Sequence, residues 1–103
     1  MLYLAQEYEI KYATNPIEAI KWLKEGNMPD GIVSDLNMPE MNGEEFLIYL
    51  KGNELFKQIP VFILSSVESS NVRIRLFEEG VEDFLLKPFN PEELRMRVKR
   101  MFK

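Results

Sequence analysis

The sequence contains neither cysteine nor histidine among its 103 residues. The absence of cysteine excludes disulfides and thiolate chemistry, and it fits a cytoplasmic location. The absence of histidine excludes histidine-based acid–base catalysis, catalytic triads and histidine metal ligands. Any chemistry must therefore rest on carboxylates, hydroxyls, lysine or arginine.

Long apolar segments are missing as well. No run approaches the roughly 18 apolar residues of a membrane span, and the N-terminus lacks the pattern of a secretory signal. The length suffices for one hydrophobic core, and the net charge of −4 argues against nucleic acid as a partner. We expect a single domain over residues 1–103 with no membrane or nucleic-acid partner.

Short strands alternate with helices along the chain. The apolar runs Gly31–Asp35, Pro60–Ser65 and Val81–Leu86 predict buried strands, and Glu9–Ala13 alternates like a strand near a sheet edge. Helical spacing follows each of them, with starts at Pro16, Gly43, Asn71 and Pro91. The order predicts a doubly wound α/β domain with a parallel sheet.

Three segments carry more specific expectations. Residues 1–8 have the pattern of the last turns of a helix, and 43–55 is predicted to be one helix. Residues 71–76 alternate like a strand, but their place between two strands favours a helix, with Ile74 and Phe77 facing inward. The Lys87-Pro88 bond is a plausible cis peptide.

Three predicted strands end in polar side chains of different chemistry, Asp35, Ser65 and Lys87. Ligands of open parallel sheets bind beyond the carboxyl ends of the strands. A carboxylate beside an ammonium and a hydroxyl can attack phosphorus, while its neighbours stabilise the phosphoryl oxygens. Taken singly, each residue has an ordinary explanation as a turn former, a polar loop residue or a solvated lysine.

The spacing of these residues is more specific than any one of them. The run Asp35-Leu-Asn-Met-Pro-Glu-Met-Asn-Gly43, a serine 30 residues after Asp35, and Lys87-Pro88-Phe89 resemble the receiver domain of two-component response regulators. The resemblance covers residues 1 to 103 and implies the flavodoxin-like (CheY-like) form of the doubly wound fold. It also implies a signalling module rather than an enzyme.

The resemblance implies a role for each matching residue. Asp35 matches the phosphoacceptor and a Mg²⁺ ligand, Asn37 the residue whose backbone carbonyl binds Mg²⁺, and Lys87 the lysine that contacts the phosphoryl group. Ser65 matches the switch hydroxyl and Phe84 the switch aromatic, although Phe84 is equally explained by core packing. The implied partners are a histidine kinase or phosphotransfer protein and a downstream protein at about residues 68–103.

One departure from the family pattern concerns the N-terminus. The family's first strand ends in an acidic pair that holds Mg²⁺, and residues 1–7 match the end of the family's first helix. The resemblance therefore implies a shortened chain in which Mg²⁺ binding and phosphorylation are impaired. The absent strand would leave a slot between 9–13 and 31–35, closed by direct pairing, by strand exchange in a homo-oligomer, which we favour, or by another polypeptide.

Two alternatives to a working phosphoacceptor remain open. A phosphorylation-independent interaction or assembly module on the same scaffold would explain the missing acidic pair. An enzyme of the flavodoxin-like class is less favoured, because the sequence has no glycine-rich phosphate loop. The basic side chains of the last predicted helix spread around it, which indicates a solvated face rather than a nucleic-acid site: Arg95, Arg97, Lys99, Arg100 and Lys103.

Overall fold

The computed structural model describes residues 2–6, 9–13, 15–37, 41–66 and 68–101, with side chains from residue 15 to 100. Its strands form one five-stranded sheet in the order β2-β1-β3-β4-β5, with helices on both faces. In chain order the elements are β1 Leu2–Gln6, β2 Glu9–Ala13, α1 Pro16–Lys24, β3 Gly31–Asp35, α2 Gly43–Lys51, β4 Val61–Ser65, α3 Ser70–Glu78, β5 Asp83–Leu86 and α4 Pro91–Met101.

The N-terminal segment is a strand, and the prediction of a helix there was wrong for the described part. β1 pairs antiparallel with both β2 and β3, with Leu4 opposite Lys11 on one side and Ile32 on the other. A five-residue segment is too short to be a stable helix by itself, whereas a strand between two others satisfies its backbone on both edges. Residues 7 and 8 lie outside the described residues.

This strand occupies the slot that we expected between residues 9–13 and 31–35. The sheet is therefore mixed: β3, β4 and β5 are parallel, as predicted, and β1 runs against β3. The structure shows none of the three expected ways of closing the slot, because residues 2–6 of the same chain lie there as β1. Association into a homo-oligomer stays a prediction, but the open slot no longer gives a reason for it.

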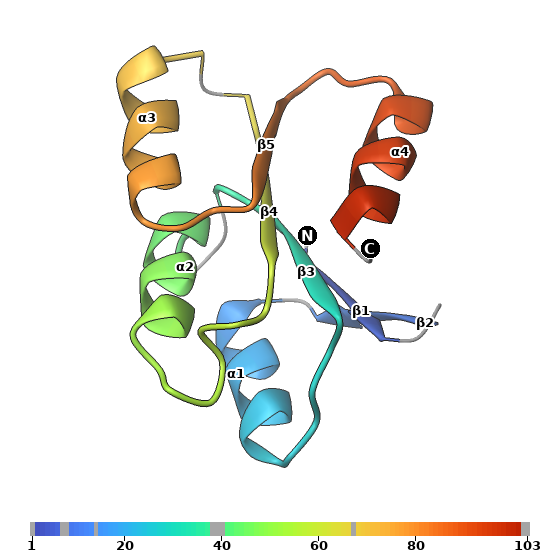
Figure 1. Ribbon diagram of the computed structural model, residues 1–103, viewed down its shortest axis with the longest axis vertical. Coiled ribbons are helices and arrows are strands. Elements are labelled where there is room, and N and C mark those ends of the chain that lie inside the picture. Colours follow the sequence, from blue (N-terminus) through green and yellow to red (C-terminus); the bar gives the residue numbers. More distant parts are fainter. Residues whose placement is uncertain (1, 7–8, 14, 38–40, 67, 102–103) are drawn as a thin grey trace.

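The helices divide unequally between the two faces of the sheet. In Figure 1, α2 and α3 lie on one side of β4 and β5, and α4 lies on the other. The larger core packs α1, α2 and α3 against one face through residues such as Leu23, Phe46 and Leu76. The smaller core packs Leu94 and Val98 of α4 against Phe62 and its neighbours.

Local sequence signals account for the ends of the helices. The Asn15 side chain accepts a hydrogen bond from the Glu18 backbone N–H at 2.8 Å, which satisfies one free donor at the start of α1. Gly80, with φ of +101°, follows α3 in a conformation that favours glycine. The Lys87-Pro88 peptide bond is cis, as the sequence made plausible.

Two details of the helix predictions were wrong. α2 ends at Lys51 with Gly52 as its C-cap, rather than continuing to residue 55. The helix over residues 70–78 is confirmed, but Ile74 and Phe77 are about half exposed, while Leu76 is fully buried. The strand-like alternation of this segment concealed which of its apolar residues form the helical stripe.

The antiparallel direction of β1 can be tested with a disulfide, because the chain has no native cysteine. Leu2 lies opposite Ser34, and residues directly opposite each other in antiparallel strands are about 4.5–5.5 Å apart at Cα, within reach of a disulfide. We expect the double variant Leu2→Cys/Ser34→Cys to oxidise to an intramolecular disulfide, measured by intact mass after alkylation. The control Ala5→Cys/Ser34→Cys stays reduced here but would oxidise if β1 ran parallel to β3.

Candidate functional site

Asp35 and Lys87 meet at the carboxyl ends of two parallel strands. The Lys87 ammonium Nζ lies 2.8 Å from Asp35 Oδ1, and the side chains are 40% and 17% exposed, respectively. Asp35 ends β3, and Lys87 directly follows β5, so two segments far apart in sequence are joined by one ion pair. The structure thus brings together two of the predicted site residues, with one side of the pair open to solvent.

The protonation state of Asp35 reflects opposing effects. Burial raises the pKa of the carboxyl, whereas neighbouring positive groups, including the hydrogen-bonded Lys87 ammonium, lower it. The net result is a pKa below the ordinary value of 3.8. Asp35 is therefore a carboxylate at neutral pH, the form required for nucleophilic attack.

Backbone pairing beyond the strands holds these ends in place. The Leu36 N–H donates to the Leu64 carbonyl at 2.8 Å, and the Lys87 N–H donates to the Ser65 carbonyl at 2.7 Å. Asp35 is opposite Leu64, and Ser65 is opposite Leu86. The three predicted residues therefore lie at one edge of the sheet, Ser65 on the strand between the other two.

Ser65 and Phe84 belong to the face covered by α1, α2 and α3. Phe84 is 6% exposed and packs in the larger core, opposite Ile63 on β4. Ser65 is 2% exposed, and the alternation of side chains along β4 places it on the same face as Ile63. In this structure Phe84 is a core residue, and its switch role stays a prediction.

Gly43 allows the chain after Asp35 to approach the start of α2 closely. Its N–H donates to the Leu36 carbonyl at 2.6 Å, and a Cβ at residue 43 would come within 2.5 Å of the Asp35 carbonyl oxygen. Asn42 precedes it as the N-cap, in a reciprocal capping box with Glu45. These contacts give a physical reason for the Asn-Gly pair that ends the Asp35 motif.

The sequence did not reveal two ion pairs that join elements through their side chains. The Arg75 guanidinium of α3 binds Glu44 of α2 through two hydrogen bonds, of 2.6 and 2.9 Å. Arg97 of α4 binds Asp83 of β5 at 3.0 Å. No local pattern pairs residues this far apart, so the tertiary structure alone reveals them.

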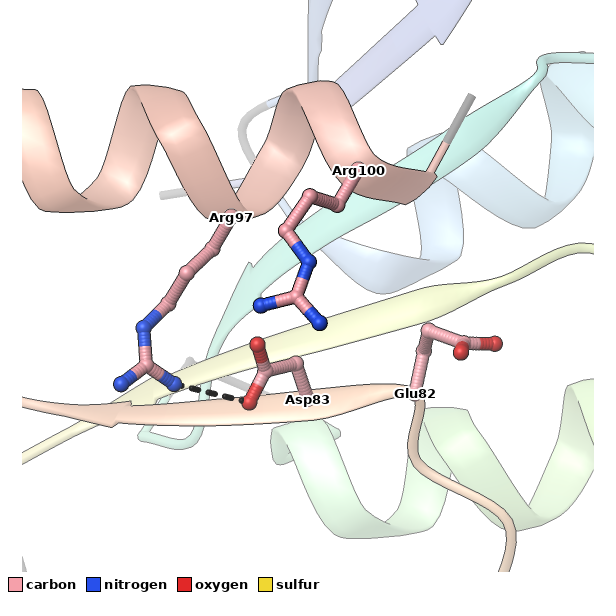
Figure 2. A pocket seen from close by; sticks show the side chains of 4 residues that line it. All are labelled: Glu82, Asp83, Arg97 and Arg100. Atoms are coloured by element: carbon pink, nitrogen blue, oxygen red, sulfur yellow. Dashed lines mark hydrogen bonds and ion pairs between the residues drawn. The ribbon is translucent and has the colours of Figure 1, made fainter. Parts of the chain in front are cut away.

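A small charged pocket lies beside the second of these ion pairs. Glu82, Asp83, Arg97 and Arg100 line it, with a volume of about 140 Å³. Figure 2 shows Arg97 of α4 bonded to Asp83, the first residue of β5, with Arg100 reaching from the same helix toward Asp83 and Glu82 at the side. The pocket is separate from Asp35 and Lys87, because it lies at the beginning of β5 and Lys87 follows its end.

Fold and site together define a class: an α/β domain with an aspartate–lysine pair beyond the carboxyl ends of its parallel strands. Residues 1–99 match the response regulator receiver domain family. The chain belongs to this family, whose members act in two-component phosphorelay signalling.

Proteins of several kinds resemble the chain. It is 38% identical over 95 residues to hybrid signal transduction histidine kinase D of Dictyostelium discoideum, covering 92% of the chain and 6% of that protein. The receiver domain of a signal transduction histidine kinase from Syntrophus aciditrophicus superposes with a TM-score of 0.82 at 34% identity, covering 93% of this chain and 72% of that one. Chemotaxis protein CheY4 of Vibrio cholerae superposes with a TM-score of 0.81 at 32% identity, covering 92% of this chain and 78% of that one.

The chain spans a small part of the full-length relatives. It covers 6% of the Dictyostelium protein and 41% of response regulator Rre1 of Synechocystis. The family is therefore that of the receiver module, which such proteins combine with other parts. In the described part of the chain, no helix is long and apolar enough to cross a membrane.

A magnesium ion is coordinated in the active-site cleft of one relative in fold, the receiver domain of a sensor histidine kinase from Pseudomonas aeruginosa that is 22% identical. Mg²⁺ requires near-octahedral oxygen ligands, several of them water. Among the described residues, no group of three acidic side chains is arranged to hold a metal ion, and Asp35 is already paired with Lys87. Asn37 is exposed beside Asp35's strand, so the described donors fit a magnesium site poorly.

Replacing Lys87 with methionine tests the electrostatics of the pair. Without the ammonium, the pKa of Asp35 should rise, because burial then acts with less opposition. The wild-type carboxylate contributes stability above its unfolded-state pKa, and that contribution disappears as pH falls through the lowered folded-state pKa. Carboxyl NMR titration measures the shift. As a control, Lys57→Met removes the ion-pair partner of the exposed Glu54 and should leave the pKa of Asp35 unchanged. An unchanged pKa in Lys87→Met would contradict this account.

Gly43→Ala tests the close approach of the Asp35 loop to α2. The added methyl would collide with the backbone of Asp35 and Leu36, and we expect it to cost about 1–3 kcal/mol in the free energy of unfolding. Urea unfolding measures this cost, and the amide shift of Asp35 should change as well. The control Gly52→Ala, where the nearest contact is 3.3 Å, should change stability by less than about 0.5 kcal/mol. Equal effects of the two substitutions would refute the role given to Gly43.

Proposed function

We propose that Asp35 accepts a phosphoryl group from the phosphohistidine of a histidine kinase or phosphotransfer protein. The observation that supports this most is the 2.8 Å contact between Asp35 Oδ1 and the Lys87 ammonium. A carboxylate held ionised beside a fixed cation is both a nucleophile and part of an anion-binding site. Membership in the receiver family agrees with the proposal.

The chemical step is an in-line displacement at phosphorus. An Asp35 carboxylate oxygen forms a bond to phosphorus, and the bond from phosphorus to the donor's imidazole nitrogen breaks. The electron pair of that bond leaves with the imidazole, which takes up a proton. The product is an acyl phosphate on Asp35, and the Lys87 ammonium turns from the carboxylate to a phosphoryl oxygen.

Through Ser65 and Phe84, phosphorylation of Asp35 would alter the surface of the domain. The Ser65 hydroxyl lies at the same edge of the sheet and is the proposed donor to a second phosphoryl oxygen. Movement of Ser65 would disturb the face on which Phe84 packs, because β4 and β5 are paired there. Phe84 is the proposed switch aromatic.

The proposed downstream partner binds α3, β5 and α4. This region carries about half-exposed apolar side chains, Ile74, Phe77 and Met96, which a partner would cover. The charged pocket of Figure 2 lies in the same region and adds a polar site for recognition. A cytoplasmic histidine kinase or phosphotransfer protein would supply the phosphoryl group at the opposite end of β5.

We further propose that phosphorylation of this chain is slow. The described residues supply Mg²⁺ with few ligands, so less charge is neutralised as the phosphoryl group transfers. Lys87 supplies one positive charge by itself. No step in the proposed mechanism depends on a bound metal.

Incubation with a small acyl phosphate donor, with and without Mg²⁺, tests the proposal by intact mass. We expect slow addition of one phosphoryl group to the wild type and none to Asp35→Asn. The receiver CheY4 of Vibrio cholerae serves as a reference for the rate. Equal modification of wild type and Asp35→Asn would exclude Asp35 as the acceptor. A wild type that stays unmodified would also overturn the proposal.

A second candidate is a phosphorylation-independent interaction or assembly module. The poor magnesium donor set among the described residues favours it. In this case Asp35→Asn should leave partner binding or assembly unchanged. Loss of binding in that variant would exclude this candidate.

A further inference from the structure

An apolar pocket lies at the end of the domain opposite to Asp35 and Lys87. It has a volume of about 330 Å³ and is formed by the end of α1 and the loop from α2 to β4, which lie next to each other at the lower end of Figure 1. These segments lead into β3 and β4, so the pocket is at the amino ends of the parallel strands. The proposed phosphotransfer, at their carboxyl ends, does not use it.

The side chains that line the pocket are mainly apolar. Leu23 and Phe56 are 2% and 3% exposed and belong to the larger core. Met28 and Leu55 also line it, but their side chains are 48% and 73% exposed. A concave site with a buried apolar lining and exposed apolar side chains beside it is typical of a binding site for an apolar ligand.

Hydrogen bonds hold both walls of the pocket. On one wall, Asn27 donates from Nδ2 to the Trp22 carbonyl at 2.8 Å, which ties the segment after α1 to the helix. On the other wall, Asn53 Oδ1 accepts from the Leu55 N–H at 2.8 Å and fixes the turn that carries Leu55. The walls are therefore formed without a ligand, and binding requires little ordering of loops.

Two further features keep this space open. Gly26, which lines the pocket, has φ of +99°, and a Cβ at this position would meet no atom within 4 Å. The Lys51 ammonium, at the end of α2, donates to the carbonyls of Lys57 and Ile59 at 3.1 and 3.0 Å. These bonds fix the later part of the loop, so contacts within the domain determine the backbone on both sides of the pocket.

The polar groups of the pocket indicate the charge of its ligand. Among the described residues that line it, Lys24 is the only charged one, and its side chain is exposed to solvent. The amide nitrogen of Asn53 can donate as well, because the bond to Leu55 uses only the amide oxygen. An ammonium and an amide donor beside an apolar surface complement a carboxylate attached to an apolar body.

We propose that this pocket binds a small apolar molecule that carries one carboxylate. The apolar body packs on Leu23 and Phe56, and the carboxylate accepts hydrogen bonds from Lys24 and Asn53. The site is independent of Asp35, so the domain holds this ligand at one end of the sheet and the proposed phosphoryl group at the other.

Titration with octanoate and with 3-phenylpropionate, followed by amide NMR, tests the proposal. We expect saturable shifts centred on residues 23–28 and 53–56, and weaker binding of octanol, which lacks the charge. Saturation by only one of the two carboxylates identifies the preferred body as alkyl or aryl. Shifts that do not saturate for either, or that are larger at Ile74 and Phe77 than around the pocket, would overturn the proposal.

Asp35→Asn separates this proposal from the proposed phosphotransfer. The variant should bind the carboxylates as the wild type does, because Asp35 lies at the other end of β3. Loss of binding in this variant would contradict an independent site. A chain that binds octanoate but accepts no phosphoryl group would retain the pocket and lose the phosphotransfer proposal.

Two exposed side chains of the pocket can be replaced without disturbing the core. Lys24→Gln should weaken binding of the carboxylates by about two- to fivefold, the size expected for an exposed ion pair, and leave octanol unchanged. Leu55→Asn should weaken binding of all three compounds by about fivefold, because apolar contact is lost. The controls Lys21→Gln, on the same helix as Lys24, and Ile17→Asn, at the other end of that helix, should bind as the wild type does. Equal losses in a variant and its control would refute the assigned contacts.

A second copy of the chain is the other possible occupant of the pocket. Amide shifts at residues 53–56 that change with protein concentration in the absence of ligand would show that the pocket is an interface between copies. That result would overturn the proposal, whereas shifts independent of protein concentration support a site that is free to bind the small molecule.

Discussion

The parallel pairing of β3, β4 and β5 is the constraint on which the site depends. It brings the carboxyl ends of three strands to one edge, and two backbone hydrogen bonds beyond the strands continue the pairing to Leu36 and Lys87. The ion pair between Asp35 and Lys87 follows from this alignment, because neither residue could reach the other across an unpaired sheet. Packing of apolar side chains on both faces holds the alignment in turn.

The residues of the candidate site differ in their exposure to solvent. Asp35 and Lys87 form the charged part, partly open to solvent, whereas Ser65 and Phe84 belong to the buried face beneath α1, α2 and α3. In the proposed mechanism, a change at Asp35 acts on the buried side through β4 and β5. The Arg75–Glu44 contact adds a second connection, since it joins α2, which follows β3, to α3, which follows β4.

The backbone around Asp35 is as specific as its side chain. The turn after β3 packs against the first residue of α2 at a distance that excludes any Cβ at Gly43, while Asn42 and Glu45 cap the helix beside it. This close packing limits how far the Asp35 loop can move relative to α2. It also explains why a glycine and a capping residue stand together at the end of the motif.

The sequence by itself determined much of the fold and selected the residues of the candidate site. Apolar runs predicted β3, β4 and β5, helical spacing predicted where α1, α2 and α4 begin, and motif spacing selected Asp35, Ser65 and Lys87. These features are local, or depend on spacing along the chain, and so they can be recognised without coordinates. The tertiary structure decided the rest: it made residues 2–6 a central antiparallel strand, because pairing on both edges outweighs the weak helical preference of a short segment. It alone paired Glu44 with Arg75 and Asp83 with Arg97, since such contacts depend on how separate elements pack.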